Sequence, residues 1–334
     1  MSALTSSASE LADSGSVVWL AGAGRSGTTW LGKIFDASPA VLYRHEPDNL
    51  AKLPFFEGLP SRIEPEDGEP EYRRRFEEGL AASASRHALH FFRPPEFEKE
   101  FTRPRLLGAV NALLRLGRAA GVTPHFGARP WLFCSEPGHV AVKSVVSNMR
   151  LGWLRRNFPG VRVVLIVRHP GGYLSSWKEG AAKHGWRGFG AVERLSPTVL
   201  PFPFPDHEKY REAFERGSDF ERELIYWIVA NETPIRQLEG DAGTHVVVYE
   251  DLCADPVGVT RELFGFAGIE MTPSVEGFVD ASTQRSTDGF HSVFKDPMDS
   301  AMKWKRTLDD DEQATVRRYL QESRLAGLWR DTEA

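Results

Sequence analysis

A glycine-rich segment near the N-terminus, GAGRSGTTWL from Gly22 to Leu31, has residues suited to holding a phosphate-like anion. It lies between a short apolar run and a helix pattern, where backbone N–H groups and the helix dipole converge on an anion. Gly22 and Gly27 have the spacing of a Walker A loop, but Thr28 stands where such loops carry lysine. The segment therefore predicts an anion site to which Arg25 adds positive charge, and it argues against ATP or GTP hydrolysis.

A second junction of the same kind is VVLIVRHPGGYLSSW, in which Arg168 ends an apolar run and Pro170 begins a helix pattern. Ser176 follows Arg168 by eight residues. A residue at the carboxyl end of a parallel strand faces the crevice where open α/β sheets bind ligands. Because the arginine fork matches phosphate geometry, two such sites predict a ligand with two separated phosphate-like groups.

An alternation of strands and helices must position these groups. Four apolar runs, each followed by a helix pattern, are typical of buried parallel strands: 17–20, 140–143, 161–167 and 244–249. One helix is expected over Thr28–Asp36, and another begins with Asp255 as its N-cap and Pro256 as its first residue. We predict an α/β fold with a central parallel sheet flanked by helices, as in P-loop nucleoside triphosphatases.

Two long segments interrupt this alternation. Residues 51–130 hold two predicted helices, around 71–89 and 105–120, and residues 181–217 have a loop-like composition. Long insertions in a compact α/β domain are usually functional lids or binding loops. We expect residues 1–15 to be a disordered tail and residues 16–330 to form one domain that carries both insertions.

Composition excludes several classes of protein. The 334 residues include 41 Lys and Arg against 46 Asp and Glu, a net charge of −5, which is unsuited to nucleic acid. No apolar stretch approaches the roughly 20 residues of a membrane-spanning helix. Cys134 and Cys253 give no disulfide framework, so we expect a cytoplasmic protein without a membrane anchor. The ten histidines are scattered, and no metal site is predicted.

Several of these motifs carry a family resemblance. GRSGTTWL resembles the 5′-phosphosulfate-binding loop of sulfotransferases that use 3′-phosphoadenosine 5′-phosphosulfate (PAPS), and Arg168 with Ser176 resembles their 3′-phosphate-binding pair. Residues 141–170 are similar to the family's lysine-bearing strand and the approach to that pair, and 246–256 to a shared strand end. KWKRTL around Trp304 resembles the loop that closes over the donor. The two insertions fall outside the resemblance.

The resemblance implies a role for each matching residue. Lys143 would reach the sulfonate, and Arg25 would lie near the transferring group, where donors stabilise the developing charge. Trp304 would pack on the donor or its covering loop, and the 3′-phosphate would also draw on cations among Lys295, Lys305 and Arg306. The resemblance assigns the 5′-phosphosulfate to the loop residues Arg25, Ser26, Gly27, Thr28, Thr29 and Trp30.

The residue at the expected position of the general base differs from the one in a branch of the family. Phenol- and steroid-type sulfotransferases have a histidine where this chain has Val145. Glu46-Pro47 instead resembles the Glu-Pro at the base position of carbohydrate-type and several bacterial enzymes, so Glu46 is the expected base and His45 the alternative. If a strand runs through 41–50, its alternation places these neighbours on opposite faces, so that only one of them faces the site.

The implied activity is transfer of a sulfuryl group from PAPS, without a metal, to a hydroxyl or amine of a small metabolite, lipid-linked sugar or glycan. Two alternatives stay open: a P-loop nucleotide kinase, and a non-catalytic nucleotide-binding protein. The insertions would lie on the acceptor side. Aromatic residues of the insertions could wall an acceptor cleft: Phe55, Phe56, Phe91, Phe92, Trp186, Phe202 and Phe204.

Overall fold

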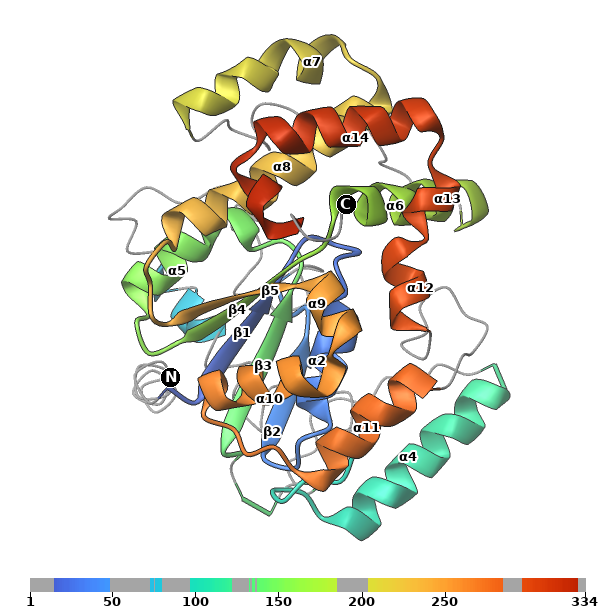
Figure 1. Cartoon of the computed structure of the whole chain (residues 1–334). Helices are drawn as coiled ribbons and strands as arrows, with labels where there is room; N and C mark the ends of the chain where they lie inside the picture. The colour runs from blue at the N-terminus through green and yellow to red at the C-terminus, as the bar shows by residue number, and fades with distance from the viewer. Residues whose placement is uncertain are drawn as a thin grey trace.

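A single parallel sheet is the centre of the fold (Figure 1). The computed structural model describes residues 15–48, 73–74, 76–79, 97–121, 132, 134–135, 137–184, 204–284 and 296–329. Within them, the strand order is β2-β3-β1-β4-β5 and every neighbouring pair is parallel. The strands are β1 (Val17–Ala21), β2 (Val41–His45), β3 (His139–Ser144), β4 (Arg162–Val167) and β5 (Thr244–Val248). The predicted fold class is confirmed.

Helices cover both faces of the sheet (Figure 1). One layer consists of α2 (Thr28–Asp36), α9 (Tyr249–Ala254), α10 (Pro256–Ala267) and α11 (Pro273–Gln284). The opposite layer contains η3 (Asn148–Arg150), α5 (Leu151–Asn157), α6 (Pro170–His184), α8 (Asp219–Gln237), α14 (Asp310–Glu322) and η5 (Arg324–Trp329). The remaining helices are α4 (Pro104–Ala119), η4 (Pro205–Tyr210), α7 (Arg211–Arg216), α12 (Pro297–Met302) and α13 (Trp304–Thr307).

The first strand shows why both layers are needed. Its side chains alternate, so Val17, Trp19 and Ala21 join one apolar core while Val18 and Leu20 join the other. All five are buried. A parallel strand of this kind is stable only when helices cover both faces. The functional side chains are therefore left to the strand ends and the loops that follow them.

Helix boundaries follow the predicted start signals. Asp255 accepts a hydrogen bond from the Gly258 N–H and Pro256 is the first residue of α10, as expected. Asp309 caps α14 and forms a capping box with Glu312. Tyr249, which the sequence placed at the end of a strand, instead begins α9.

The two insertions give a mixed outcome. The helix expected over 105–120 is α4. Within the helix expected over 71–89, the structure describes residues 73–74 and 76–79, and these are helical. The loop-like interpretation of 181–217 is wrong for 181–184, which end α6, and for 205–216, which form η4 and α7. The reason is tertiary anchoring, because His207 and Tyr210 are buried and Asp206 pairs with Arg236 of α8 at 2.8 Å.

Several expectations concern residues outside the described part. The tail lies there apart from Gly15, as do all the aromatic residues proposed for an acceptor cleft except Phe204. Phe204 packs under the guanidinium of Arg236, 3.6 Å from its ring centroid. Among the described helices, none is long and apolar enough to cross a membrane.

Candidate active site

The register of the sheet brings three strand ends together. Lys143 on β3 pairs with Leu20 on β1 and with His45 on β2. The carboxyl ends of parallel strands share one edge of a sheet, which is where open α/β folds bind ligands. The glycine-rich loop after β1, the lysine of β3 and the carboxylate after β2 are consequently neighbours.

The glycine-rich loop leads into α2 with its helix N-terminus uncapped by side chains. Gly27 is the N-cap, with φ 89°, and no acidic residue lies in the first turn. A Cβ on Gly27 would lie 2.4 Å from the Tyr249 ring, so both the backbone angle and the packing require glycine. Arg25 has φ 73°, which is uncommon for a residue with a side chain. This geometry leaves the helix dipole available to an anion.

The two predicted anion-binding arginines lie together. Arg25 Nε donates a hydrogen bond to Ser176 Oγ at 3.0 Å, and Arg168 Nη1 donates to the Arg25 carbonyl at 3.0 Å. Arg168 also donates to the Ser300 carbonyl at 2.6 Å and lies over the Tyr249 ring at 4.7 Å. Burial, with the nearby charge of Arg168, lowers the pKa of Arg25 to about 10. An anion bound here would relieve that repulsion.

Glu46 and Lys143 form an ion pair at the next strand ends. Lys143 is 2% exposed, and its ammonium contacts Glu46 Oε1 and lies 3.5 Å from Thr29 Oγ1. The Glu46 N–H also donates to the Lys143 carbonyl at 2.8 Å, which continues the β2–β3 pairing beyond the strand. Burial lowers the pKa of Lys143, although Glu46 opposes this shift. A cation and a carboxylate thus lie beside the start of α2.

The expectation that His45 and Glu46 point to opposite faces is wrong. The strand ends at His45, and Glu46 takes a left-handed conformation with φ 47°. The Glu46 Oε1 atom then lies 3.7 Å from His45 Nε2, while His45 Nδ1 lies 2.8 Å from the Tyr43 hydroxyl. Alternation applies only while the chain stays extended, so one turn of the backbone puts both side chains in reach of each other.

A buried clamp behind this pair was missed by the sequence reasoning. Asp48 accepts a hydrogen bond from Ser144 Oγ at 2.8 Å and forms an ion pair with Arg150. The Asp48 carboxyl is fully buried, and burial raises its pKa although Arg150 and Ser144 act in the opposite direction. The clamp joins the chain after β2 to the end of β3 and to η3, and so fixes where Glu46 meets Lys143.

The other predicted donor-binding residues lie on α2 and α13. Trp30 is buried, and its indole N–H donates to Ser282 Oγ at 3.0 Å. Trp304 is buried and stacks on His169, with ring centroids 4.4 Å apart. Lys305 Nζ lies 5.9 Å from the Trp304 ring.

Two predicted cations have different outcomes. Arg306 is exposed and pairs with Asp299 at 2.6 Å, so its charge is already partly compensated. Lys295 lies outside the described residues.

In the part of the chain that the structure describes, no group of three or more His, Cys, Asp or Glu side chains is arranged to hold a metal ion.

Comparison with known proteins gives one family. The family model described as "Sulfotransferase family" matches residues 18–273. Mouse (Mus musculus) carbohydrate sulfotransferase 3 is 34% identical over 230 residues, covering 63% of this chain and 40% of the relative. The human (Homo sapiens) carbohydrate sulfotransferase 3 is 35% identical over 77 residues, covering 22% and 16%. The chain therefore spans less than half the length of these curated relatives.

Solved structures of sulfotransferases resemble the chain as well. A mouse sulfotransferase complexed with PAP shares 11% identity and a TM-score of 0.42, covering 99% of this chain and 90% of that one. The sulfotransferase domain from the curacin biosynthetic pathway shares 14% identity and a TM-score of 0.40, covering 91% and 96%.

Proposed function

Because this chain belongs to the sulfotransferase family, we propose that it transfers a sulfuryl group from PAPS to an acceptor hydroxyl or amine. The observation that carries the proposal is the meeting of two groups of residues at one sheet edge. Arg25, Arg168 and Ser176 lie together beside an uncapped helix N-terminus, and the Glu46–Lys143 pair lies at the adjoining strand ends.

The loop and arginine residues fit the donor. The Ser26 hydroxyl is fully buried and has no hydrogen-bond partner among the described residues, as expected of a group that completes its bonding with a ligand. In the proposal, residues 25–30 hold the 5′-phosphosulfate and Arg168 with Ser176 holds the 3′-phosphate. Trp304, Lys305 and Arg306 would add contacts from the C-terminal side, as in the family resemblance.

The proposed reaction is an in-line displacement. The acceptor oxygen or nitrogen forms a bond to sulfur, the bond from sulfur to the bridging phosphate oxygen breaks, and the acceptor proton passes to Glu46. Lys143 and Arg25 stabilise the negative charge that develops on the bridging oxygen. The products are the sulfated acceptor and adenosine 3′,5′-bisphosphate (PAP).

The contact between Glu46 and Lys143 supports Glu46 over His45 as the base. Glu46 is held beside Lys143 by both its side chain and its backbone N–H, so base and cation keep a fixed relation. His45 is 31% exposed and bonds to Tyr43, which makes it a neighbour of the base rather than its replacement.

We further propose a small-metabolite, lipid-linked sugar or glycan acceptor, without nucleic acid, and a metal-free reaction. A cytoplasmic location is proposed from the two cysteines, which are both free thiols. The proposed single domain over 16–330 would use both insertions on the acceptor side. Fractionation of cells that express the tagged protein tests the location.

Thermal unfolding with PAP, and in parallel with ATP and Mg²⁺, tests the proposed activity first. A ligand at about a hundred times its dissociation constant stabilises the native state by about 2.7 kcal/mol, a clear rise in Tm. A rise with PAP alone supports the donor site. A rise only with ATP and Mg²⁺ would favour a kinase. A protein that binds PAP but releases none from PAPS with any acceptor of a panel would favour the non-catalytic alternative.

A further inference from the structure

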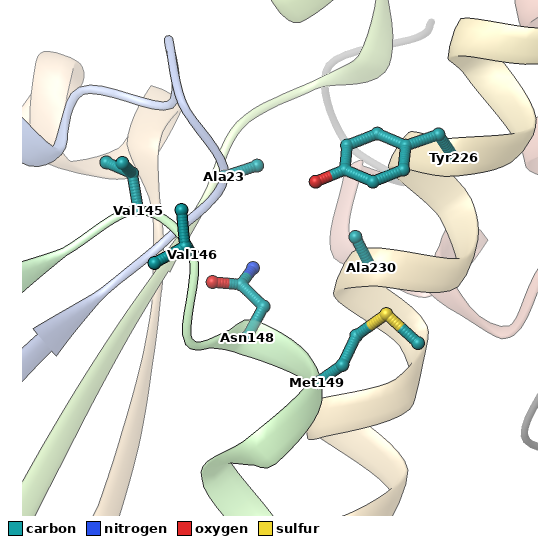
Figure 2. A pocket seen from close by; sticks show the side chains of 7 residues that line it. All are labelled: Ala23, Val145, Val146, Asn148, Met149, Tyr226 and Ala230. Carbon is teal, nitrogen blue, oxygen red and sulfur yellow. The ribbon is translucent and has the colours of Figure 1, made fainter. Parts of the chain in front are cut away.

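A small pocket opens between α8 and the segments that follow β1 and β3 (Figure 2). Its walls come from three parts of the chain: the loop after β1, the connection from β3 through η3, and α8. The lining residues are Ala23, Val145, Val146, Asn148, Met149, Tyr226 and Ala230. Ala23 belongs to the glycine-rich loop, and Val145 follows Lys143 by two residues. The pocket therefore lies between α8 and the segments that follow β1 and β3, the same two segments from which the proposed site draws Arg25 and Lys143.

Asn148 is the residue that the pocket leaves unsatisfied. Its side chain is 5% exposed, and neither Oδ1 nor Nδ2 has a hydrogen-bond partner among the described residues. Figure 2 shows the amide rising from η3 into the space that Ala23 and Tyr226 border. Buried polar groups are almost always paired, because leaving them unpaired costs free energy. An amide with both its donor and its acceptor unpaired is suited to a ligand.

The chemistry of the walls selects the ligand group. None of the seven lining residues carries a charge, and five are Ala, Val or Met. A carboxylate or sulfate would enter without a cation among the lining residues to neutralise it, which is unfavourable. A hydroxyl suits both atoms of the amide, since its O–H donates to Oδ1 and its oxygen accepts from Nδ2. Tyr226 adds a phenol at the rim.

Resting on the proposed function, we propose that Asn148 and Tyr226 bind a second, non-reacting hydroxyl of the acceptor. The attacking hydroxyl must reach Glu46 after β2, and Glu46 is not among the residues that line the pocket, so the hydroxyl bound in the pocket is a different one. The acceptor is then an uncharged polyol, such as a neutral sugar ring. Asn148 acts as a specificity residue by holding one hydroxyl while a neighbouring one reacts.

The test compares acceptors with and without a second hydroxyl. PAP release from PAPS is measured with p-nitrophenyl β-D-glucoside, its glucuronide counterpart and 2-phenylethanol, for the wild type, Asn148→Leu and Tyr226→Phe. We expect Asn148→Leu to lower kcat/KM about 10-fold or more for the glucoside, mainly through KM, and to leave 2-phenylethanol unchanged. Tyr226→Phe gives a smaller loss of the same kind, and the wild type prefers the glucoside to the glucuronide.

Controls separate the subsite from the fold and from the proposed function. Asn157→Leu makes the same substitution on α5, where the amide nitrogen donates to the carbonyl of Trp153. Equal losses for the glucoside and 2-phenylethanol, or no loss in Asn148→Leu, overturn the subsite and indicate a structural amide or a buried water. A preference for the glucuronide, or no turnover of the glucoside by an enzyme that sulfates 2-phenylethanol, also overturns it. Failure of PAP to raise Tm refutes the proposed function instead.

Discussion

The two halves of the candidate site are built in different ways. In the first half, the proposed anion-binding side chains come from the segments after two strands: Arg168 follows β4 directly, and Arg25 lies in the glycine-rich loop between β1 and α2. The second half depends on pairs between strands: Glu46 with Lys143, and Asp48 with Ser144. An anion site can thus be encoded locally, whereas a site that moves a proton needs partners that only the sheet brings together.

The largest effect should follow from removing the carboxylate of the second half. Glu46→Gln keeps the size of the side chain but removes the proposed base, and loss of a general base costs about 10²–10⁴-fold in rate. PAP affinity should persist because the first half is intact. Steady-state kinetics and PAP titration measure the two quantities. Glu270→Gln, at an exposed position, is the matched control. A wild-type rate in Glu46→Gln would transfer the assignment to His45.

Breaking the clamp behind the base should cost stability. Asp48→Asn leaves the buried Arg150 without its carboxylate, and removing one partner of a buried ion pair costs about 3–5 kcal/mol. Chemical denaturation measures the loss. Asp241→Asn is the comparison, because Arg155 pairs with Asp241 at 2.7 Å where the carboxylate is 28% exposed, and its loss should be smaller. Equal losses would show that burial of the clamp does not matter.

Weakening the first half should affect the donor and spare the base. In Arg168→Ala, PAP loses charge-assisted hydrogen bonds of about 1.5–3 kcal/mol, so its dissociation constant should rise about 10–100-fold. Titration calorimetry measures the constant. Arg261→Ala, which removes a surface arginine paired with Glu276, should leave it unchanged. An unaltered constant in Arg168→Ala would remove this residue from the donor site.

The smallest effect should be a change in the shape of the pH profile. Burial lowers the pKa of Lys143 from its ordinary value of 10.5. A lysine is charged below its pKa, so activity that needs the cation is complete at lower pH and is lost as pH rises through that lowered value. Lys143→Arg keeps the charge and should move the alkaline decline to higher pH, as measured in kcat/KM profiles recorded between about pH 7 and about pH 10. Lys178→Arg, on the exposed side of α6, should leave the decline in place.

The same division explains what the sequence could predict. The strands and α2 follow from local patterns. Arg25 and Arg168 were also singled out by local motifs, but the contact between them is seen only in the structure. Asp48 and Arg150 are separated by 102 positions, so no local pattern links them. Asn148 belongs to no sequence motif. It stands out because its buried amide has no hydrogen-bond partner among the described residues. The wrong prediction for His45 and Glu46 has a single cause, the left-handed backbone of Glu46. The helices over 205–216 form through contacts with α8, such as the pair of Asp206 with Arg236.

The packing of Trp304 determines which experiment can test the C-terminal cations. A Cβ on Gly171 would lie 2.6 Å from the Trp304 ring, and the same ring stacks on His169. Thr307 Oγ1 contacts Ser175 Oγ at 2.6 Å, and Ser300 supplies a carbonyl to Arg168. A protein shortened before Asp296 would lose the cover over the start of α6 together with Lys305 and Arg306. Its weaker binding of PAP would report that lost cover, so single substitutions in an intact chain are the informative experiment.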